Sequence, residues 1–372
     1  MTRTIACVLA LLGAACGHDA ANAPAANAPA AKAPGSGAST VAVLPASDRI
    51  FAVSDPAGGP DLVLGADGDA LWLATVGGAV RWRVSGPGVV THVVAGDYGH
   101  GAHLYVARGV GRGFLAAPLV LQALDLATGA ATELARLDGE RNEAAHLSID
   151  DVDRDGRPEL AFAFYDSKYT VRTRHLEADG AVRDGAPVRM ASSRAYGDLD
   201  GDGKIDEVVG RVYGDAKGEP GDLKVDLGAG FVWVPVEQGV RALLVARLGD
   251  DVGPTLYVAD GWVANYGKDA RATLKRVRFA AGKPVVEAVG RSPDDFTFFA
   301  LTAADVDGDG APEIVAQGSK QVSVFSPGPV LPWARRAVVP TEPVLNTAVA
   351  RGPGGVVALV PGRPVTRTYP LK

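Results

Sequence analysis

Asp151-Val152-Asp153-Arg154-Asp155-Gly156-Arg157-Pro158-Glu159 is a nine-residue stretch whose pattern the chain uses three times. The pattern returns as Asp198-Leu199-Asp200-Gly201-Asp202-Gly203-Lys204-Ile205-Asp206 and as Asp305-Val306-Asp307-Gly308-Asp309-Gly310-Ala311-Pro312-Glu313. Each copy has carboxylates at positions 1, 3, 5 and 9 and glycine at position 6. Four acidic side chains this close together repel one another unless a cation lies among them. The stretch therefore predicts a metal-binding turn.

The residue types in the three copies favour calcium. Calcium takes six to eight oxygen ligands in a flexible shell, and alternate Asp side chains in a short loop can supply them. Glycine at position 6 permits the left-handed turn that returns position 9 to the metal. The backbone carbonyl at position 7 is expected to complete the protein ligands. The predicted ligand sets, for about three structural ions, are Asp151, Asp153, Asp155, Arg157 and Glu159; Asp198, Asp200, Asp202, Lys204 and Asp206; and Asp305, Asp307, Asp309, Ala311 and Glu313.

Two other interpretations of these loops fit the sequence less well. Asp and Gly are common in surface turns, but the same spacing in three places favours a metal. An EF-hand needs a bidentate Glu at position 12 and a following helix. Position 12 is Phe162, Val209 or Ala316, and short apolar runs typical of strands follow the loops. Each loop is therefore expected to join two strands.

These residues resemble the FG-GAP/VCBS repeats of β-propellers similar to the N-terminal domain of integrin alpha chains. The repeat consensus is D-x-D-x-D-G-x-x-D followed by a short apolar strand. The match is specific in three places and degenerate elsewhere. The resemblance implies a propeller with calcium in the turns of its blades and a role as a binding or scaffold module.

Weaker copies fill the spaces between the strong ones. The first two strong copies start 47 residues apart and the third starts 107 residues later, which leaves room for a hidden repeat. Loops of the same shape with few carboxylates indicate seven repeats, starting near residues 55, 97, 151, 198, 250, 305 and 351. Two further strands are expected in each repeat, for example 71–75 and 80–84 in the first and 119–124 and 132–135 in the second. Four antiparallel strands per repeat are typical of a propeller blade.

The seventh repeat reaches the end of the chain before its outer strand. Only Val365–Tyr369 follows its second strand, whereas Thr40–Leu44 is a strand without a blade of its own. We expect Thr40–Leu44 to complete the last blade and to close the ring, because closure removes an exposed sheet edge. The fold class is thus all-β: a seven-bladed β-propeller of four-stranded antiparallel blades over residues 39–372.

The amino terminus reads as an export signal over residues 1–15. A basic residue, a short apolar core and small residues precede Cys16. Leu11–Cys16 resembles a bacterial lipobox, with Gly13 where leucine is preferred, so Cys16 is the expected lipidation site. An ordinary secretory cleavage nearby is the alternative. Residues 16–38 form a tether rich in alanine and proline, which favours an extended chain.

The expected location is the outer membrane or the cell surface, with a periplasmic or secreted protein as the alternative. The signal's apolar run is too short to cross a bilayer, so the lipid alone would contact the membrane. Because two or more acyl chains are needed for stable anchoring, a diacylglyceryl group plus an amide-linked chain on Cys16 would anchor the protein stably. Cys7 and Cys16 are the only cysteines, so residues 39–372 contain no disulfide.

Charge and composition limit the partners. The net charge of −6 does not suggest a nucleic acid; a protein or glycan ligand and a monomeric chain are expected. His100 and His103 lack an evident third zinc ligand and read as surface histidines. Large aromatics mostly bury, so the tryptophans are expected to pack between blades. The remaining carboxylates, taken as turn residues, are Asp166, Asp260, Asp294 and Asp295.

The sequence favours a binding module over an enzyme. It has no G-x-S-x-G, H-E-x-x-H, P-loop or Rossmann motif, and its clustered carboxylates are assigned to metal. Propellers host binding and catalysis alike, so a polysaccharide lyase or glycosidase and a quinone-dependent dehydrogenase remain the alternatives. The turns at 125–129 and 78–82 are slightly similar to quinoprotein repeats. A lipoprotein of a larger envelope assembly is a third interpretation.

Overall fold

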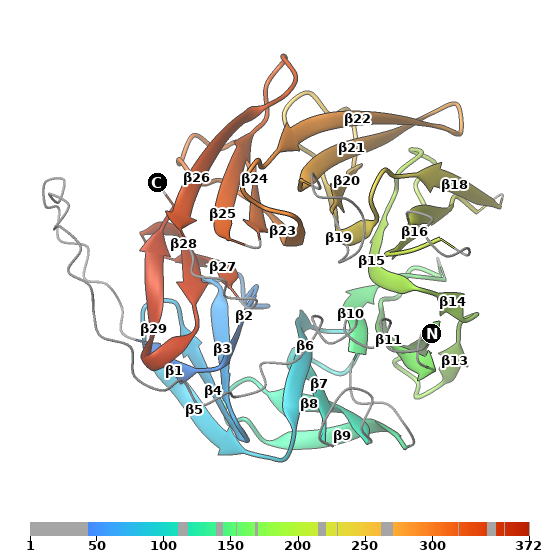
Figure 1. The fold of residues 1–372 in the computed structure, drawn as a ribbon. Coiled ribbons are helices and arrows are strands. Elements are labelled where there is room, and N and C mark those ends of the chain that lie inside the picture. The colour runs from blue at the N-terminus through green and yellow to red at the C-terminus, as the bar shows by residue number, and fades with distance from the viewer. Residues whose placement is uncertain are drawn as a thin grey trace, which may run out of the picture.

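The computed structural model describes residues 44–371 except 111–117, 139–143, 154, 168–169, 215–220, 229, 262–270, 319, 341–346 and 353. The signal segment 1–15, Cys16, the tether 16–38 and residues 39–43 lie outside the described residues. Within the described ranges the chain is all-β and contains no helix, so none that could span a membrane. Its strands form seven antiparallel sheets, or blades, arranged in a ring (Figure 1).

The first three blades follow one another along the chain. Blade one contains β2 (Arg49–Val53), β3 (Leu62–Asp67), β4 (Ala70–Thr75) and β5 (Val80–Ser85). Blade two contains β6 (Val89–Gly96), β7 (His103–Gly109), β8 (Leu119–Asp125) and β9 (Ala131–Leu137). Blade three contains β10 (Ala144–Asp150), β11 (Glu159–Ser167), β12 (Thr170–Leu176), β13 (Val182–Asp184) and β14 (Val188–Arg189).

The next three blades repeat this order. Blade four contains β15 (Ala191–Gly197), β16 (Asp206–Arg211), β17 (Asp222–Asp226) and β18 (Phe231–Pro235). Blade five contains β19 (Val240–Ala246), β20 (Thr255–Asp260), β21 (Thr273–Ala280) and β22 (Lys283–Arg291). Blade six contains β23 (Phe298–Ala304), β24 (Glu313–Gly318), β25 (Gln321–Ser326) and β26 (Ala334–Pro340).

Blade seven joins the two ends of the described chain. It contains β27 (Ala348–Gly352), β28 (Gly355–Val360), β29 (Gly362–Pro370) and, as its outer strand, β1 (Leu44–Ser47). β1 pairs antiparallel with β29, with Leu44 opposite Thr366. The predicted closure by an N-terminal strand is confirmed. The described part of this strand runs from Leu44, the last residue of the predicted Thr40–Leu44, and Thr40–Val43 lie outside the described residues.

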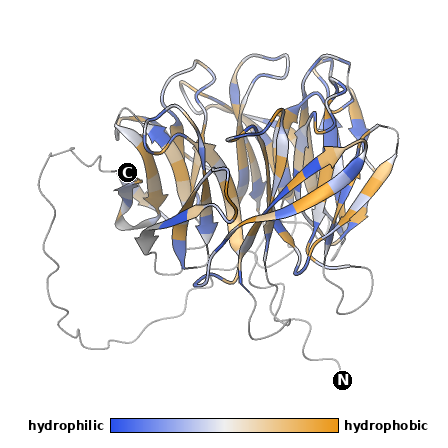
Figure 2. Cartoon of the chain, turned by 90° about the horizontal axis from the view of Figure 1, so that it is seen from above, coloured by the Kyte–Doolittle hydropathy of each residue, from blue (hydrophilic) through white to orange (hydrophobic). Residues whose placement is uncertain are grey.

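Apolar packing between blades holds the ring together. The second strand of each blade lies between two others in its sheet and is almost wholly buried, as in β3, β20 and β24. Hydrophobic residues are concentrated in the strands, and the loops along both edges of the ring are largely hydrophilic (Figure 2). Gly96 of blade two shows how close the packing is, because a Cβ atom there would lie 2.7 Å from Cδ1 of Ile149 in blade three.

Blade three departs from the four-strand pattern. Its outer edge is divided into β13 and β14, and both pair with β12. Gly185, Ala186 and Pro187 separate them. Proline has no N–H to donate to the sheet, so it interrupts a strand. The outer part of blade three is consequently short, which matters for the side chains that face it from blade four.

Candidate metal centres

The three acidic loops occupy the same place in three blades. Each joins the first strand of its blade to the second: β10 to β11, β15 to β16 and β23 to β24. The expectation that the loops lie between strands is confirmed. The glycine at position 6 adopts positive φ in each copy, at +88° for Gly156, +85° for Gly203 and +89° for Gly310. A side chain at this φ is strained, which explains why glycine is used.

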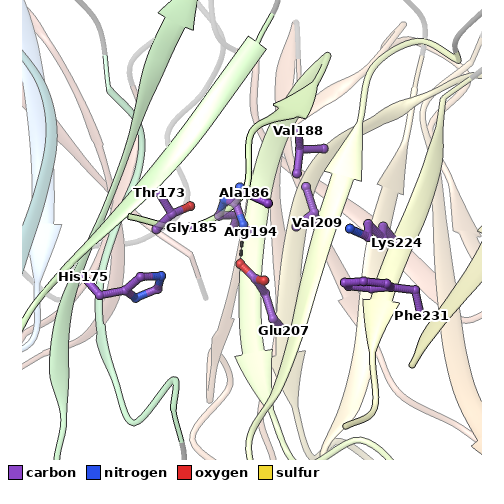
Figure 3. Close-up of a pocket in the computed structure, with 10 residues that line it drawn as sticks. All are labelled: Thr173, His175, Gly185, Ala186, Val188, Arg194, Glu207, Val209, Lys224 and Phe231. Carbon is purple, nitrogen blue, oxygen red and sulfur yellow. Dashed lines mark hydrogen bonds and ion pairs between the residues drawn. The ribbon is translucent and has the colours of Figure 1, made fainter. Parts of the chain in front are cut away.

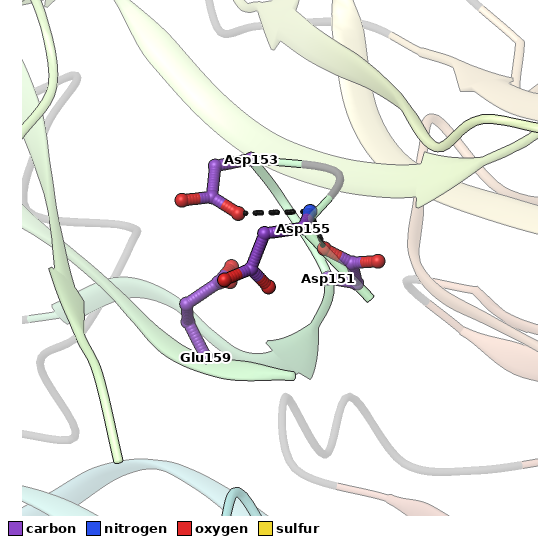
Figure 4. Close-up of side chains that lie close together, drawn as sticks. All are labelled: Asp151, Asp153, Asp155 and Glu159. Atoms are coloured by element: carbon purple, nitrogen blue, oxygen red, sulfur yellow. Dashed lines mark hydrogen bonds between the residues drawn. The ribbon is translucent and has the colours of Figure 1, made fainter. Parts of the chain in front are cut away.

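The loops bring carboxylate oxygens together. One oxygen each from Asp151, Asp153, Asp155 and Glu159 lies within 4.8 Å of the others, and Figure 4 shows these side chains converging. The second loop brings together Asp198, Asp200 and Asp206 within the same limit, and the third brings together Asp305, Asp307 and Glu313. Asp202 and Asp309 are not members of these groups.

Backbone hydrogen bonds fix the first and last carboxylates in the same way in each copy. At position 9, Glu159, Asp206 and Glu313 accept from the N–H of position 2 at 2.7, 2.8 and 2.8 Å. At position 1, Asp151, Asp198 and Asp305 accept from the N–H of the glycine at position 6, at 3.0, 3.1 and 3.0 Å. The acidic groups are thus held by the turn itself.

The carboxylate at position 5 belongs to the group in only one of the three copies. Asp202 accepts a 2.8 Å hydrogen bond from the Lys204 N–H, and Asp309 accepts one of 2.7 Å from the Ala311 N–H. Asp155 makes the equivalent bond to the Arg157 N–H at 2.8 Å yet still belongs to its group. The backbone carbonyls of Arg157, Lys204 and Ala311 remain predicted ligands.

The position 9 carboxylates are buried beside other negative charges. Glu159 is fully buried, and among the described residues its Oε1 has no hydrogen-bond partner. Burial, and then Asp153, Glu177 and Asp151 nearby, raise the pKa of Glu159 to about 7. Burial also raises the pKa of Glu313. A cation bound among these oxygens would provide the absent partner and offset the repulsion.

The loops that lack most of the carboxylates are held by hydrogen bonds and ion pairs within the protein. Asp97 keeps position 1 and accepts from the N–H of Gly99 at 2.7 Å and of Gly101 at 2.9 Å, and these bonds lower its pKa. In blade five, the buried Asp251 accepts from the Tyr257 hydroxyl and from Arg276, at 3.4 Å. Arg276 also pairs with Asp250 at 2.9 Å. A protein cation thus supplies the positive charge in that loop.

Several residues outside the loops differ from their predicted roles. Asp260 is fully buried, which corrects its reading as a turn residue; it pairs with Lys275 at 2.7 Å and accepts from the N–H groups of residues 237–239. Asp295 is also buried and accepts from Ser292 at 2.7 Å. Sequence alone could not distinguish Asp260 from a turn residue, because its partner Lys275 lies on the neighbouring strand β21.

Of the predicted surface histidines, His100 is exposed and His103 is half-buried, and the tryptophans follow the prediction in part. Among the described residues, no group of three potential metal ligands includes His100 or His103. Trp72, Trp82 and Trp333 are buried, as expected from packing between blades, whereas Trp233 is 50% exposed. Trp262 lies outside the described residues.

No family model matches this sequence, and no curated protein matches it. Among solved structures, the chain is similar in fold to two propeller proteins. The crystal structure of Sqt1 from Saccharomyces cerevisiae has a TM-score of 0.50 at 10% identity, over 87% of this chain and 84% of that one. The crystal structure of BBS1N in complex with ARL6DN, soaked with lead, has a TM-score of 0.53 at 11% identity, over 89% of this chain and 94% of that one. Identities this low support the propeller fold alone.

Proposed function

We propose that this chain is a calcium-stabilised β-propeller that acts as a non-enzymatic binding or scaffold module at the bacterial cell envelope. The lipid group on Cys16 anchors it, and the tether over residues 16–38 holds the ring away from the membrane surface. The FG-GAP/VCBS resemblance of the loops supports this proposal. A protein or a glycan is the expected partner.

The observation that carries the proposal is the geometry of the acidic loops. Three turns at equivalent places each bring three or four carboxylates within 4.8 Å, and Glu159 Oε1 is buried without a partner in the part of the chain that the structure describes. Oxygen-only donor sets suit the hard cations calcium and magnesium rather than zinc or copper. Calcium fits best, because magnesium requires a nearly ideal octahedron and loses its water reluctantly.

A structural metal ion accounts for these carboxylates better than catalysis does. Each position 9 carboxylate is fixed by a backbone N–H, and each loop joins two strands of one blade. This arrangement supports a structural ion that holds the turn. A glycosidase needs two carboxylates that face each other across a substrate, whereas these face a shared point within one loop.

Metal analysis and thermal unfolding test the proposal together. A ligand that binds only the folded chain stabilises it by RT ln(1 + [L]/Kd), about 2.7 kcal/mol per site at 100 times Kd. The purified chain should carry about three calcium ions, and excess chelator should lower its Tm strongly. An unchanged Tm together with no bound metal would refute the calcium role. Recovery of the chain in the membrane fraction, lost in C16S, tests the anchor.

A further inference from the structure

The interface between blades three and four differs from the other six. Each pair of neighbouring blades shares one cluster of buried apolar side chains, and six of these clusters have nine or more buried members among the described residues. The cluster between blades three and four has four, namely Ala163, Val171, Ala191 and Val209. Only Ala145, Tyr165 and Val188, which are partly buried, pack against it among the described residues, so this interface has the smallest buried apolar core of the seven.

Polar side chains from both blades occupy it. Thr173 and His175 of β12 face Arg194 of β15 and Glu207 of β16 around a cavity of about 170 Å³ (Figure 3). Arg194 is 5% exposed, and it donates from Nη1 to Glu207 Oε1. Its Nε and Nη2 atoms have no hydrogen-bond partner within the described ranges. Two of the three nitrogen atoms of this buried guanidinium therefore donate no hydrogen bond to the described residues.

Further buried polar atoms at this interface lack partners. Among the described residues these include Thr173 Oγ1 and His175 Nδ1, both on the side of β12 that faces the cavity. Burial lowers the pKa of His175, so its ring is neutral at pH 7. Buried polar groups in folded proteins almost always have a partner, so these atoms call for one that ordered water or a bound molecule can supply.

The rest of the cavity is apolar and opens toward the outside of the ring. Val188, Val209, Ala186 and Phe231 line it. Ala186 lies between the two short outer strands of blade three and is exposed, and Phe231 on the outer strand β18 is 54% exposed. The division of the outer strand of blade three into β13 and β14 leaves this side of the cavity uncovered. A small molecule can therefore enter without separating the blades.

The charges around the cavity favour an anion. The lining has two cations, Arg194 and Lys224, and one anion, Glu207. The Lys224 Nζ atom lies 3.4 Å from the centre of the Phe231 ring. A guanidinium matches a carboxylate, because two parallel N–H groups can donate to its two oxygens. The apolar wall favours a carbon skeleton behind the carboxylate. An apolar cavity of about 150 Å³ holds a benzene molecule, so one small ring would fit.

We infer that the cavity between blades three and four is a binding site for a small organic carboxylate with an apolar body. The carboxylate pairs with Arg194, and Thr173 and His175 lie beside it. The skeleton packs on Val188, Val209 and Phe231. This inference names a ligand class for the proposed binding role and in that sense rests on it, but the calcium loops contribute no residue to the cavity.

Calorimetric titration of the calcium-loaded chain with benzoate tests the site, with benzamide as the neutral molecule of the same shape. Benzoate should bind at least about tenfold more tightly, because a charge-assisted pair replaces a neutral contact. R194K should weaken benzoate binding by about tenfold or more, since lysine keeps the charge but loses the paired donors. R278K is the matched control, because Arg278 pairs with Glu287 on blade five.

Two further variants keep the inference testable if R194K folds poorly. E207Q removes the one negative charge in the lining and should tighten benzoate binding. A186W places a large side chain at an exposed position of the opening and should abolish binding without loss of Tm. Equal binding of benzoate and benzamide, weaker binding in E207Q, or no effect of A186W would overturn the inference and indicate a cavity filled by water.

The outcomes separate this inference from the proposed function. If benzoate fails to bind while calcium still raises the Tm, the carboxylate site is wrong and the calcium-stabilised module stands. If benzoate binds but the chain carries no calcium, the carboxylate site stands and the calcium-stabilised module is wrong.

Discussion

Ser47 and Thr366 lie 319 residues apart in sequence, and their hydroxyl oxygens are 2.8 Å apart. Both side chains are buried. Thr366 also donates to the carbonyl oxygen of Pro45 at 2.8 Å. These bonds join β1 to β29, so they hold the two ends of the described chain within one blade (Figure 1).

Loss of this closure should destabilise the whole ring. Deleting residues 44–47 removes the outer strand of blade seven, exposes the edge of β29 and uncovers the core around Leu44, which is fully buried. We expect a much lower Tm and more aggregation, measured by thermal unfolding with light scattering. For the hydroxyl pair alone, T366V should cost about 1 kcal/mol. T132V, at an exposed site on β9, is its control. A truncated chain that melts like the parent would contradict the closure.

The second prediction distinguishes the acidic loops from the degenerate ones. The triple variant D198N/D200N/D202N should lose one of about three calcium ions and keep the others, because each loop supplies its own ligands. D97N should change the metal content little, since among the described residues Asp97 belongs to none of the groups of potential metal ligands. Metal analysis after dialysis measures both. Equal loss of calcium in the two variants would show that the assignment of the loops is wrong.

Much of the fold could be predicted because its signals are local. The Asp and Gly residues of each loop lie within nine positions, and the apolar strand that follows each loop marks the second strand of a blade. The closing strand is harder to delimit from the sequence, because its position depends on pairing between Leu44 and Thr366 rather than on a local pattern.

The polar interface between blades three and four could not be predicted in this way. Along β12, Thr173 and His175 alternate with Arg172 and Arg174, so both faces of the strand look polar in sequence. Which face meets blade four is decided by the order of the blades. The same holds for Asp260, whose partner Lys275 lies on the neighbouring strand.

The third prediction concerns the loop of blade five, in which Arg276 pairs with Asp250 and Asp251. Arg276 and Asp251 are both buried, and removal of one partner leaves a buried charge without compensation. R276M should destabilise the chain by about 3 kcal/mol or more, and equally with calcium and with chelator. R278M, whose side chain is 41% exposed, should lose less than about 1 kcal/mol. Denaturant unfolding measures both. A loss in R276M that vanishes in chelator would refute an independent role for this cation.

The last prediction is a dependence of stability on pH that comes from two histidines on inner strands. Burial and then Arg49 lower the pKa of His92 from 6.5 to about 4, and burial, with His92 and Arg194 nearby, lowers that of His146 to about 3. Between pH 6.5 and these values the unfolded chain binds protons that the folded chain does not. The free energy of unfolding contributed by these rings is therefore complete above pH 6.5 and falls as the pH drops toward 4.

Carboxylates in the calcium loops also respond to acid, so variants must be compared with the parent at each pH. In H92Q/H146Q the fall between pH 7 and pH 5 should be shallower than in the parent, whereas H100Q, at an exposed loop position, should match it. Denaturant unfolding at each pH, in saturating calcium, measures the slopes. Parallel curves for H92Q/H146Q and the parent would show that the folded chain does not lower the pKa of these rings.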